Sequence, residues 1–418
     1  MPSTQTKPTL FPILLVNFID ALGFSVVIPF LVVIVIKLGG HELVYGFLSA
    51  TYSFFQLIGA PILGNWSDKF GRKKILLISE AGTFIAWLIF LVGLVIPNHQ
   101  LKINTGFAGN ILFSLPLLMI FLGRALDGLT GGNISVANAY VADISVKDDR
   151  KRNFGKMAAA SNLGLIFGPL LAGLLGATAL GNILPVVVTA FISLVALSVI
   201  YFKVQDRAAK PVSKATPGII PTKQTTFKGL KSVLKLPYVP YFLILYFLIF
   251  LGFNFFYVGF PVYAAGQLHW SVLQLGIFFS FLSGMMVLME GPVMGYLSKR
   301  ISGAALVIAG STILCGCFVL LRFDSIVYIY AGALLFAIGN GIMWPSFIAL
   351  LSNTGTEHVQ GMIQGFASSA GSLASIIGLI SGAFLYHTLG ANLFLLTAGF
   401  MLLIAFLAVP LIKIEKKM

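Results

Sequence analysis

The stretch Gly64-Asn-Trp-Ser-Asp68-Lys-Phe-Gly71-Arg72-Lys73-Lys74 lies between two apolar runs, 44–65 and 74–96. Each run is long enough to cross a bilayer as a helix, which takes about 20 residues. Between them a tight glycine turn gathers one acid and four bases at the membrane surface. A charged turn that joins two spanning helices indicates a membrane protein.

The composition of the whole chain agrees with this interpretation. Of its 418 residues, 58% are hydrophobic and 10% are charged, whereas soluble proteins carry about 25% charged residues. We therefore predict an all-α membrane protein with twelve transmembrane helices. The predicted spans are 11–34, 44–65, 74–96, 112–140, 153–178, 182–203, 238–264, 271–297, 303–322, 325–350, 359–386 and 391–413.

The chain has a net charge of +14, and its basic residues are unevenly distributed between the two sides of the predicted spans. If the N-terminus is inside, 23 of the 27 Lys and Arg residues fall on the inner side of the predicted spans, Lys37, Lys102 and Arg322 fall outside, and Arg124 lies within a span. This skew is typical of cytoplasmic loops and predicts that both termini are cytoplasmic. It indicates contact with anionic lipid headgroups and argues against nucleic acid as a partner.

The chain divides into two similar halves. Pro61-Ile-Leu-Gly64-Asn-Trp-Ser67 recurs as Pro292-Val-Met-Gly295-Tyr-Leu-Ser298, and residues 204–237 break the apolar rhythm with prolines and lysines. We predict two pseudo-symmetric six-helix bundles, 1–203 and 238–418, joined by a basic cytoplasmic linker at 204–237. A duplicated bundle of this kind is typical of transporters, which bind substrate at the repeat interface.

The charged turn, with its pattern G-x-x-x-D-x-x-G-R-K, resembles the signature loop between helices 2 and 3 of the major facilitator superfamily. This superfamily consists of secondary transporters, so the resemblance implies transport. It also implies that the turn is a conformational latch that holds the cytoplasmic side closed in one state. A loop that only sets topology and anchors helix ends is the alternative. The latch residues would be Gly64, Asp68, Gly71, Arg72 and Lys73.

A few ionisable residues fall inside the predicted spans. They are Asp20, Glu80, Arg124, Asp127 and Glu290. A charge at the bilayer centre costs about 2.5–3.5 kcal/mol on insertion scales, so such a residue usually faces a cavity or a partner. Asp20 and Arg124 lie at similar depth near the middle of the bilayer. Glu80 and Glu290 lie nearer the cytoplasmic ends of their spans, where they either bind a cationic group or pair with nearby bases.

The segments Asn17-Phe-Ile-Asp20-Ala-Leu-Gly23 and Gly123-Arg124-Ala-Leu-Asp127-Gly128 resemble the first and fourth helices of twelve-helix drug:proton antiporters, with the closest likeness to tetracycline efflux pumps. The resemblance implies that Asp20, Arg124 and Asp127 take part in proton coupling, because a buried carboxyl beside an arginine can gain and lose a proton. A static buried pair that joins helices 1 and 4 is the alternative. Asp127 departs from many relatives, which have a neutral residue there, and it could compete with Asp20 for Arg124.

The fifth span contains Gly164-Leu-Ile-Phe-Gly168-Pro169-Leu-Leu-Ala-Gly173, which resembles the signature G-x-x-x-G-P-x-x-[GA]-G of antiporters. Proline removes a helix hydrogen bond and kinks the helix. Within the family the motif marks exporters more than importers. The alternative is ordinary close packing of helices.

Polar and aromatic residues recur at one-turn spacing on several spans, and we predict that they line a mostly apolar substrate chamber. They are Asn17, Tyr52, Gln56, Asn162, Asn254, Tyr257, Glu290, Asn340, Trp344 and Gln364. Such a chamber suits an amphipathic molecule. Ordinary contacts between helices are the alternative for each of them.

Together these features predict a proton-coupled exporter of small amphipathic compounds in a bacterial inner membrane, acting as a monomer by alternating access. The alternative is a transporter for one dedicated solute, such as a sugar, a siderophore or a lipid, which could be an importer. We expect no enzymatic activity, cofactor or metal site, because the sequence has no metal-ligand cluster, nucleophile–base pair or phosphate-binding loop. The two cysteines, Cys315 and Cys317, face different ways on one helix.

Overall fold

The structure, a computed structural model, describes residues 10–98, 100–105, 109–131, 133–145, 149–204, 234–354 and 357–417. Within these ranges, eleven helices are long and apolar enough to cross a membrane. The predicted linker 204–237 lies almost wholly outside the described residues.

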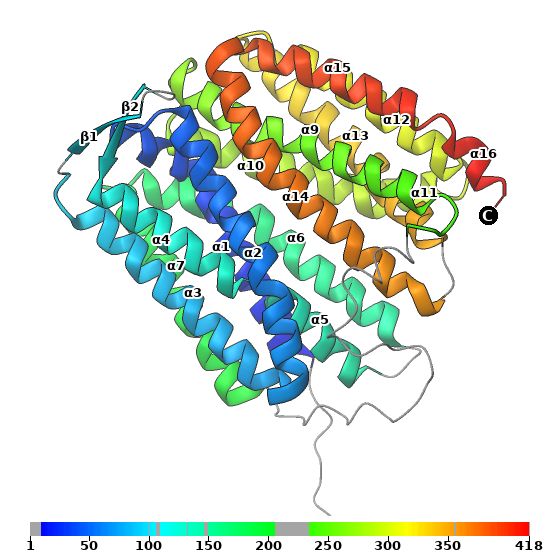
Figure 1. Ribbon diagram of the computed structural model, residues 1–418, viewed down its shortest axis with the longest axis horizontal. Coiled ribbons are helices and arrows are strands. Elements are labelled where there is room, and N and C mark those ends of the chain that lie inside the picture. Colours follow the sequence, from blue (N-terminus) through cyan, green and yellow to red (C-terminus); the bar gives the residue numbers. More distant parts are fainter. Residues whose placement is uncertain are drawn as a thin grey trace, which may run out of the picture. The chain divides into compact units, whose positions relative to one another are not determined.

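In its described residues, the first half of the chain forms seven helices and one pair of strands, and Figure 1 shows their arrangement. These elements are α1 Phe11–Lys37, α2 Glu42–Phe70, α3 Arg72–Val95, β1 Gln100–Thr105, β2 Gly109–Ser114, α4 Leu115–Thr130, α5 Asn133–Ile144, α6 Arg150–Gly176 and α7 Ile183–Lys203. The two strands pair antiparallel, with Gln100 opposite Ser114 and Thr105 opposite Gly109.

In its described residues the second half contains helices and the turns that join them, and no strand. Its elements are α9 Val239–Gly266, α10 Val272–Leu288, the π-helical turn η2 Met289–Val293, α11 Met294–Leu297, α12 Gly303–Leu320, α13 Ile326–Ser352, α14 Glu357–Leu389, α15 Asn392–Leu407 and α16 Leu411–Glu415. The π-helical turn contains Pro292, whose missing N–H disturbs the regular helix pattern.

The prediction of an all-α membrane protein is confirmed. Within the described residues eleven of the twelve predicted spans are helices that could cross a membrane, and the fourth needs local correction. The fourth predicted span, 112–140, starts within β2 and is divided into α4 and α5 after Thr130. The short strand pair before it was not predicted. Its first strand alternates polar and apolar residues, Leu101-Lys102-Ile103-Asn104, which is the two-residue period of a strand.

Contacts divide the chain into two units. Unit 1 contains Met1–Val44, Thr51–Val212 and Ser271–Ser280, and unit 2 contains Tyr45–Ala50, Ser213–Trp270 and Phe281–Met418. The predicted boundaries at 203 and 238 stay a prediction.

In unit 1, α1 packs along α6, and α3 packs against α4 and α7. Near one end of the unit a core cluster combines side chains of α1, α2, α3, α5, α6 and α7, among them Ile13, Leu63, Ile75 and Tyr140. Gly71 joins α2 to α3 with a φ of 95°, a conformation that L side chains rarely adopt. The turn between these helices therefore needs glycine at this position.

In unit 2 the core is rich in aromatic side chains. Phe256 of α9 lies against Phe336 of α13, with ring centres 4.8 Å apart, and against Phe318 of α12 at 5.9 Å. The carboxylate of Glu415 accepts hydrogen bonds from the backbone N–H groups of Gly303 and Ala304, at 2.8 and 2.9 Å. It thus satisfies the first turn of α12, where a negative charge is favourable.

Candidate proton-coupling site

A buried ion pair lies on α4. The Nη1 atom of Arg124 donates to Oδ2 of Asp127 at 3.2 Å, one helical turn further on. Arg124 is only 6% exposed. A charge pair of this kind is stable away from water only when its members are paired with each other or hydrogen-bonded.

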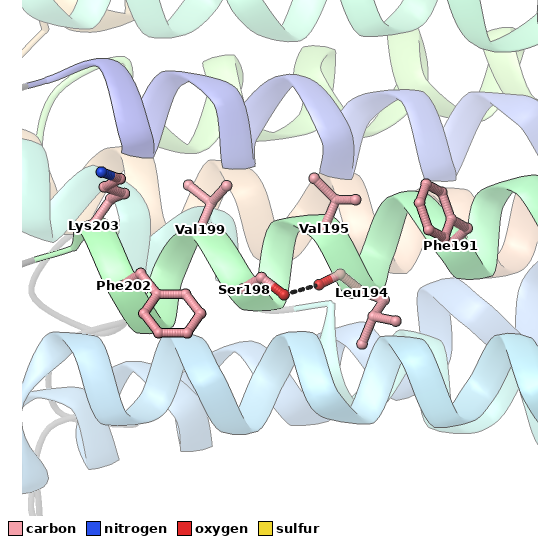
Figure 2. A pocket seen from close by; sticks show the side chains of 7 residues that line it. All are labelled: Phe191, Leu194, Val195, Ser198, Val199, Phe202 and Lys203. Carbon is pink, nitrogen blue, oxygen red and sulfur yellow. Dashed lines mark hydrogen bonds between the residues drawn. The ribbon is translucent and has the colours of Figure 1, made fainter.

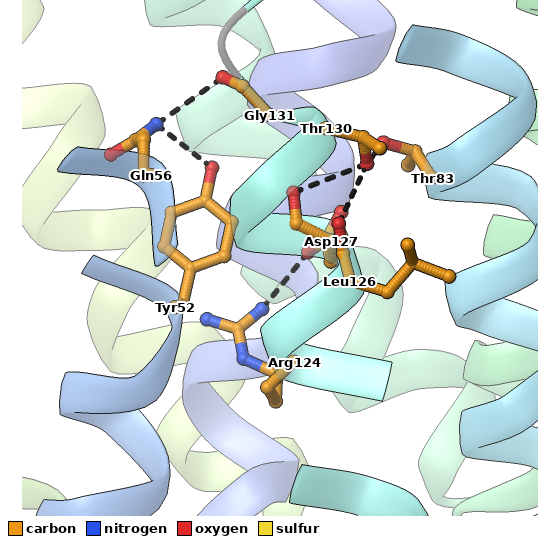
Figure 3. Close-up of polar contacts among 8 residues, drawn as sticks. All are labelled: Tyr52, Gln56, Thr83, Arg124, Leu126, Asp127, Thr130 and Gly131. Carbon is orange, nitrogen blue, oxygen red and sulfur yellow. Dashed lines mark hydrogen bonds and ion pairs between the residues drawn. The ribbon is translucent and has the colours of Figure 1, made fainter. Parts of the chain in front are cut away.

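Tyr52 of α2 covers the guanidinium of Arg124 from one side. The ring centre lies 4.4 Å from Cζ of Arg124, which is a cation–π contact. Nε2 of Gln56 donates to the Tyr52 hydroxyl at 3.1 Å and to the carbonyl of Gly131 at 3.3 Å. Figure 3 shows these side chains of α2 turned toward α4. Of the ten predicted chamber residues, Tyr52 and Gln56 therefore lie in the cluster around Arg124.

Around this ion pair α2 and α3 approach α4 closely, because glycines lie at the points of contact. A Cβ atom on Gly128 would lie 2.4 Å from the backbone carbonyl oxygen of Tyr52. The side chain of Thr130 leaves similarly little room beside Gly82 of α3. The hydroxyl of Ser79 donates to the Thr130 carbonyl, so α3 is also hydrogen-bonded to α4.

Asp20 of α1 and Glu80 of α3 lie near the same cluster. Asp20 is within electrostatic reach of Tyr52, which in turn contacts Arg124. Glu80 is fully buried, with 0% exposure, and the carboxyl of Asp20 lies within hydrogen-bonding reach of it. The sequence analysis did not place Glu80 in the site, although an acid within a predicted span was the signal that could have done so.

The predicted Asp20–Arg124 pair stays a prediction. The ion pair that the structure gives Arg124 is with Asp127, on its own helix. Asp127 therefore pairs with the arginine, and its competition with Asp20 stays a prediction.

Other predicted residues of the first half make packing contacts. Nδ2 of Asn17 donates to the Met157 carbonyl at 2.8 Å and to the Ser161 hydroxyl at 2.5 Å, both on α6. The Ser25 hydroxyl donates to the Gly164 carbonyl at 3.1 Å. Asn162 lies half-buried on α6.

The glycines of the α6 motif allow this close packing against α1. A Cβ on Gly164 would lie 2.5 Å from the Phe18 carbonyl oxygen, and one on Gly168 would overlap Ser25. Pro169 lies within α6, and Gly173 lies close to Leu273 of the same unit. The contacts of Gly164 and Gly168 fit the packing alternative, while any role of the motif in export stays a prediction.

The predicted chamber residues of the second half lie on four elements of unit 2. Trp344 of α13 packs on Tyr246 and Phe250 of α9, with ring centres 5.2 and 5.3 Å apart. Asn254 donates to the Phe250 carbonyl at 2.7 Å and to the Ser375 hydroxyl at 3.1 Å.

The remaining chamber residues of unit 2 differ in their surroundings. Oδ1 of Asn340 is buried and has no hydrogen-bond partner among the described residues. Glu290 lies in η2 and is within electrostatic reach of Tyr257. Gln364 donates to the Ser352 hydroxyl at 3.1 Å.

The charged turn between α2 and α3 is organised by Arg72. Its Nη1 atom lies 2.5 Å from Oδ1 of Asp68 and 2.6 Å from the Ser67 hydroxyl, and its Nε donates to Oδ2 of Asp143 at 3.1 Å. Asp143 belongs to α5, so this arginine ties three helices together. The sequence analysis quoted Asp143 within a motif but gave it no role. Of the other latch residues, Lys73 lies over the ring of Tyr201 at 5.8 Å and Gly64 accepts from Ser67 at 2.7 Å.

A shallow hollow of about 300 Å³ lies elsewhere, along α7. Figure 2 shows that all of its lining side chains come from this single helix, from Phe191 to Lys203. Phe191 and Phe202 are 64% and 75% exposed. An apolar helix face of this kind, ending in a lysine, suits contact with lipid acyl chains and headgroups. It does not include any predicted site residue.

The charged cluster of unit 1 is suited to moving protons. Within the described residues no group of three His, Cys, Asp or Glu side chains could hold a metal ion. The cluster instead combines three carboxyls, one guanidinium and hydroxyl groups in a buried setting, a combination that allows a proton to be bound and released.

Comparison with known proteins connects this arrangement to transport. The sequence model of the Major Facilitator Superfamily matches residues 13–378 and 291–417. The chain is 27% identical over 380 residues to the class H tetracycline resistance protein of Pasteurella multocida, covering 90% of this chain and 88% of that protein. It is 26% identical over 439 residues to multidrug resistance protein 2 of Bacillus subtilis strain 168, covering 99% and 98%.

The fold is also similar to that of solved transporters. The crystal structure of the human organic anion transporter MFSD10 (TETRAN) matches 96% of this chain and 98% of its own, with a TM-score of 0.68 and 20% sequence identity. At this identity the match supports a common fold only.

Proposed function

Because the chain belongs to the Major Facilitator Superfamily, we propose that it is a proton-coupled antiporter that exports small amphipathic compounds by alternating access. The observation that carries the proposal is the buried Arg124–Asp127 pair with Asp20 and Tyr52 beside it. The similarity to tetracycline and multidrug resistance proteins over 90% and 99% of this chain supports the class of substrate.

Burying charges at this site costs free energy, and a purely structural contact between helices could be made without them. Placing a charge at the bilayer centre is unfavourable by about 2.5–3.5 kcal/mol on insertion scales. An apolar pair of similar volume often stabilises a protein as well as a buried ion pair does. Retaining ionisable residues on α1, α3 and α4 therefore fits a site whose protonation changes during the cycle.

In the proposed cycle, Asp20 is ionised when the transporter is open to the cytoplasm and takes up substrate. The transporter then opens outward, releases substrate, and Asp20 binds a proton. Protonation weakens the attraction between Asp20 and Arg124, and the protonated form returns inward. In the state described here, Asp127 holds Arg124 at 3.2 Å.

The driving force is sufficient for export. A membrane potential of 100 mV supplies about 2.3 kcal/mol per charge, and one pH unit adds about 1.4 kcal/mol. With one proton per neutral substrate, the total of about 3.7 kcal/mol sustains a concentration ratio of several hundred.

Substrate recognition falls to adaptable apolar surfaces with a few polar groups. Trp344, Tyr246 and Phe250 supply an aromatic surface in unit 2. Asn340, whose carbonyl oxygen lacks a described partner, supplies a polar anchor. Aromatic and methionine side chains suit molecules of varied shape.

The turn organised by Arg72 is the proposed cytoplasmic latch. Its bonds to Asp68 and Asp143 hold α2, α3 and α5 together in one state and part in another. Such partly exposed ion pairs contribute little to stability, so they suit a contact that is repeatedly made and broken.

We place the protein in a bacterial inner membrane as a monomer with both termini in the cytoplasm. The similarity to bacterial resistance proteins supports the membrane, and the excess of basic residues on the predicted inner side supports the orientation. These basic residues bind anionic lipid headgroups.

The proposal is tested with everted membrane vesicles that are energised by respiration and contain the protein. Adding a tetracycline-like or dye-like drug should release part of the internal acidity, as reported by a pH-sensitive dye. Vesicles with Asp20→Asn at equal protein levels should show no release. If several drugs have no effect and a single metabolite elicits proton movement, the chain transports one dedicated solute and the proposal is wrong.

A further inference from the structure

Glu80 occupies an unusual position for a carboxyl group. It lies on α3 inside the helix bundle of unit 1, with 0% exposure. Neither of its carboxyl oxygens has a well-formed hydrogen bond among the described residues, and the polar groups within reach are the Ser193 hydroxyl and the Asp20 carboxyl. An ionised carboxylate that is removed from water without a partner is strongly unfavourable. Such a group requires either a nearby cation or a proton.

The surroundings of Glu80 offer acids more readily than bases. Its main neighbour is the carboxyl of Asp20 on α1, within hydrogen-bonding reach, and Asp127 of α4 lies within electrostatic reach. From α7 the neighbouring group is the hydroxyl of Ser193. From α5 the nearest acid is Asp143, which is bonded to Arg72 two turns away along α3.

The one arginine of the cluster already has other partners in this state. Arg124 donates to Asp127, and Tyr52 of α2 lies over its guanidinium. Three carboxyls therefore share a single guanidinium within the described part of the cluster, and full ionisation would leave an excess of negative charge. Figure 3 shows the paired arginine between α2 and α4.

Two carboxyl groups attract each other only when one of them carries a proton. An ionised carboxylate is purely an acceptor, whereas a protonated one has an O–H that donates. Two carboxylates that share a site do not both ionise readily, and they titrate as a pair. A close approach of Asp20 and Glu80 is therefore favourable only when one of the two carboxyls carries a proton.

We propose that Asp20 and Glu80 form a two-carboxyl proton site, in which one proton is shared between α1 and α3 and a second proton binds during transport. The coupling proton then comes from the aqueous phase to the remaining carboxylate, which makes both carboxyls neutral. The second proton removes the remaining negative charge of the pair and so changes the balance of charge around the Arg124–Asp127 ion pair. The inference rests on the proposed function and replaces a single acid by a pair.

Infrared difference spectroscopy on the purified full-length protein tests the shared proton directly. At neutral pH the wild type should show the C=O stretching band of a protonated carboxyl. The band should be lost in Glu80→Gln and in Asp20→Asn, and kept in Glu80→Asp, which retains the acid. The matched control is Asp149→Asn, an exposed acid paired with Arg152 at 3.0 Å, which should keep the band. A band that persists in Glu80→Gln, or that is absent from the wild type, overturns the proposal.

The pH dependence of drug-driven proton release provides the second readout. Glu80→Gln should move the midpoint of this profile by about one pH unit or more, because the remaining acid titrates alone. A profile equal to that of the wild type overturns the pair as the coupling unit. If Glu80→Gln does not fold, loss of the infrared band in Asp20→Asn tests the pair in its place, and a band that persists there overturns the proposal.

The two proposals fail in different ways. Absence of drug-driven proton release from the wild type contradicts the proposed function, whatever the infrared spectra show. Normal release by the wild type, together with an unchanged band in Glu80→Gln, contradicts only the carboxyl pair.

Discussion

Arg124 and Asp127 are bonded to each other at 3.2 Å, one turn apart on α4, while the ring of Tyr52 lies 4.4 Å from the same guanidinium. The arginine is thus held by one charge on its own helix and by one aromatic face on α2. Asp20 is then the main charged neighbour of Glu80. The predictions below test the parts of this arrangement separately.

Removal of the acid from the buried pair should be strongly destabilising. Asp127→Asn leaves the guanidinium of Arg124 buried without its counter-charge, which should lower the free energy of unfolding by about 3 kcal/mol. The double variant Arg124→Gln/Asp127→Asn should be more stable than Asp127→Asn, because no unpaired charge remains. Unfolding in detergent solution measures both. Equal stability of the single variant and the wild type would contradict the pairing, and Asp149→Asn is the exposed control.

The ring of Tyr52 should matter more than its hydroxyl. Tyr52→Phe keeps the aromatic ring over Arg124 and loses only the hydrogen bond that Gln56 donates to the hydroxyl. Gln56 still donates to the Gly131 carbonyl. Tyr52→Leu removes the cation–π contact, which is worth about 2 kcal/mol when desolvated. We expect Tyr52→Leu to unfold at a clearly lower temperature than Tyr52→Phe. The reverse order in thermal unfolding would show that the hydroxyl is the important group.

The close approach of α2 to α4 should depend on Gly128. A methyl group there would lie 2.4 Å from the backbone oxygen of Tyr52, so Gly128→Ala must push the helices apart. We expect a loss of about 1–3 kcal/mol in stability, as for other overpacked interiors. Gly155→Ala is the matched control, because nothing lies within 4 Å of its added Cβ. It should leave stability unchanged or raise it, and equal losses at both sites would contradict the account.

The latch should affect transport more than stability. Asp143→Asn and Asp68→Asn each remove a partner of Arg72, and these acid side chains are 42% and 60% exposed. The stability cost should therefore stay within about 1 kcal/mol. Drug transport should fall about fivefold or more, because the balance between the two open states changes. Transport assays at matched protein levels, beside thermal unfolding, separate the two effects, and unchanged transport in both variants would limit the turn to a topological role.

Much of the architecture could be predicted from the sequence because lipid imposes simple rules. The lengths of the apolar runs determined the spans, and the Gly71 turn between α2 and α3 appears where the charged stretch predicts it. The strand pair before α4 was missed because a short alternating segment near an apolar run carries a weak signal. The break between α4 and α5 was missed for a related reason, since an apolar run does not show where a helix is interrupted.

The residues of the site could be predicted from the sequence, but most of the contacts between them could not. Asp20, Arg124 and Asp127 were selected because charges in a membrane are costly, and they do gather in one region of unit 1. The bond of Arg72 to Asp143 and the contact of Glu80 with Asp20 join residues far apart in sequence. Such contacts depend on helix rotation and packing, which composition and spacing do not determine.

The most direct test of the central claim uses the purified protein in liposomes with an imposed pH gradient, acidic inside, and no membrane potential. We predict that a tetracycline-like drug accumulates in these liposomes, that a proton ionophore abolishes the accumulation, and that Asp20→Asn does not accumulate the drug. Accumulation that survives the ionophore, or that is equal in Asp20→Asn and the wild type, would contradict proton-coupled export through this site.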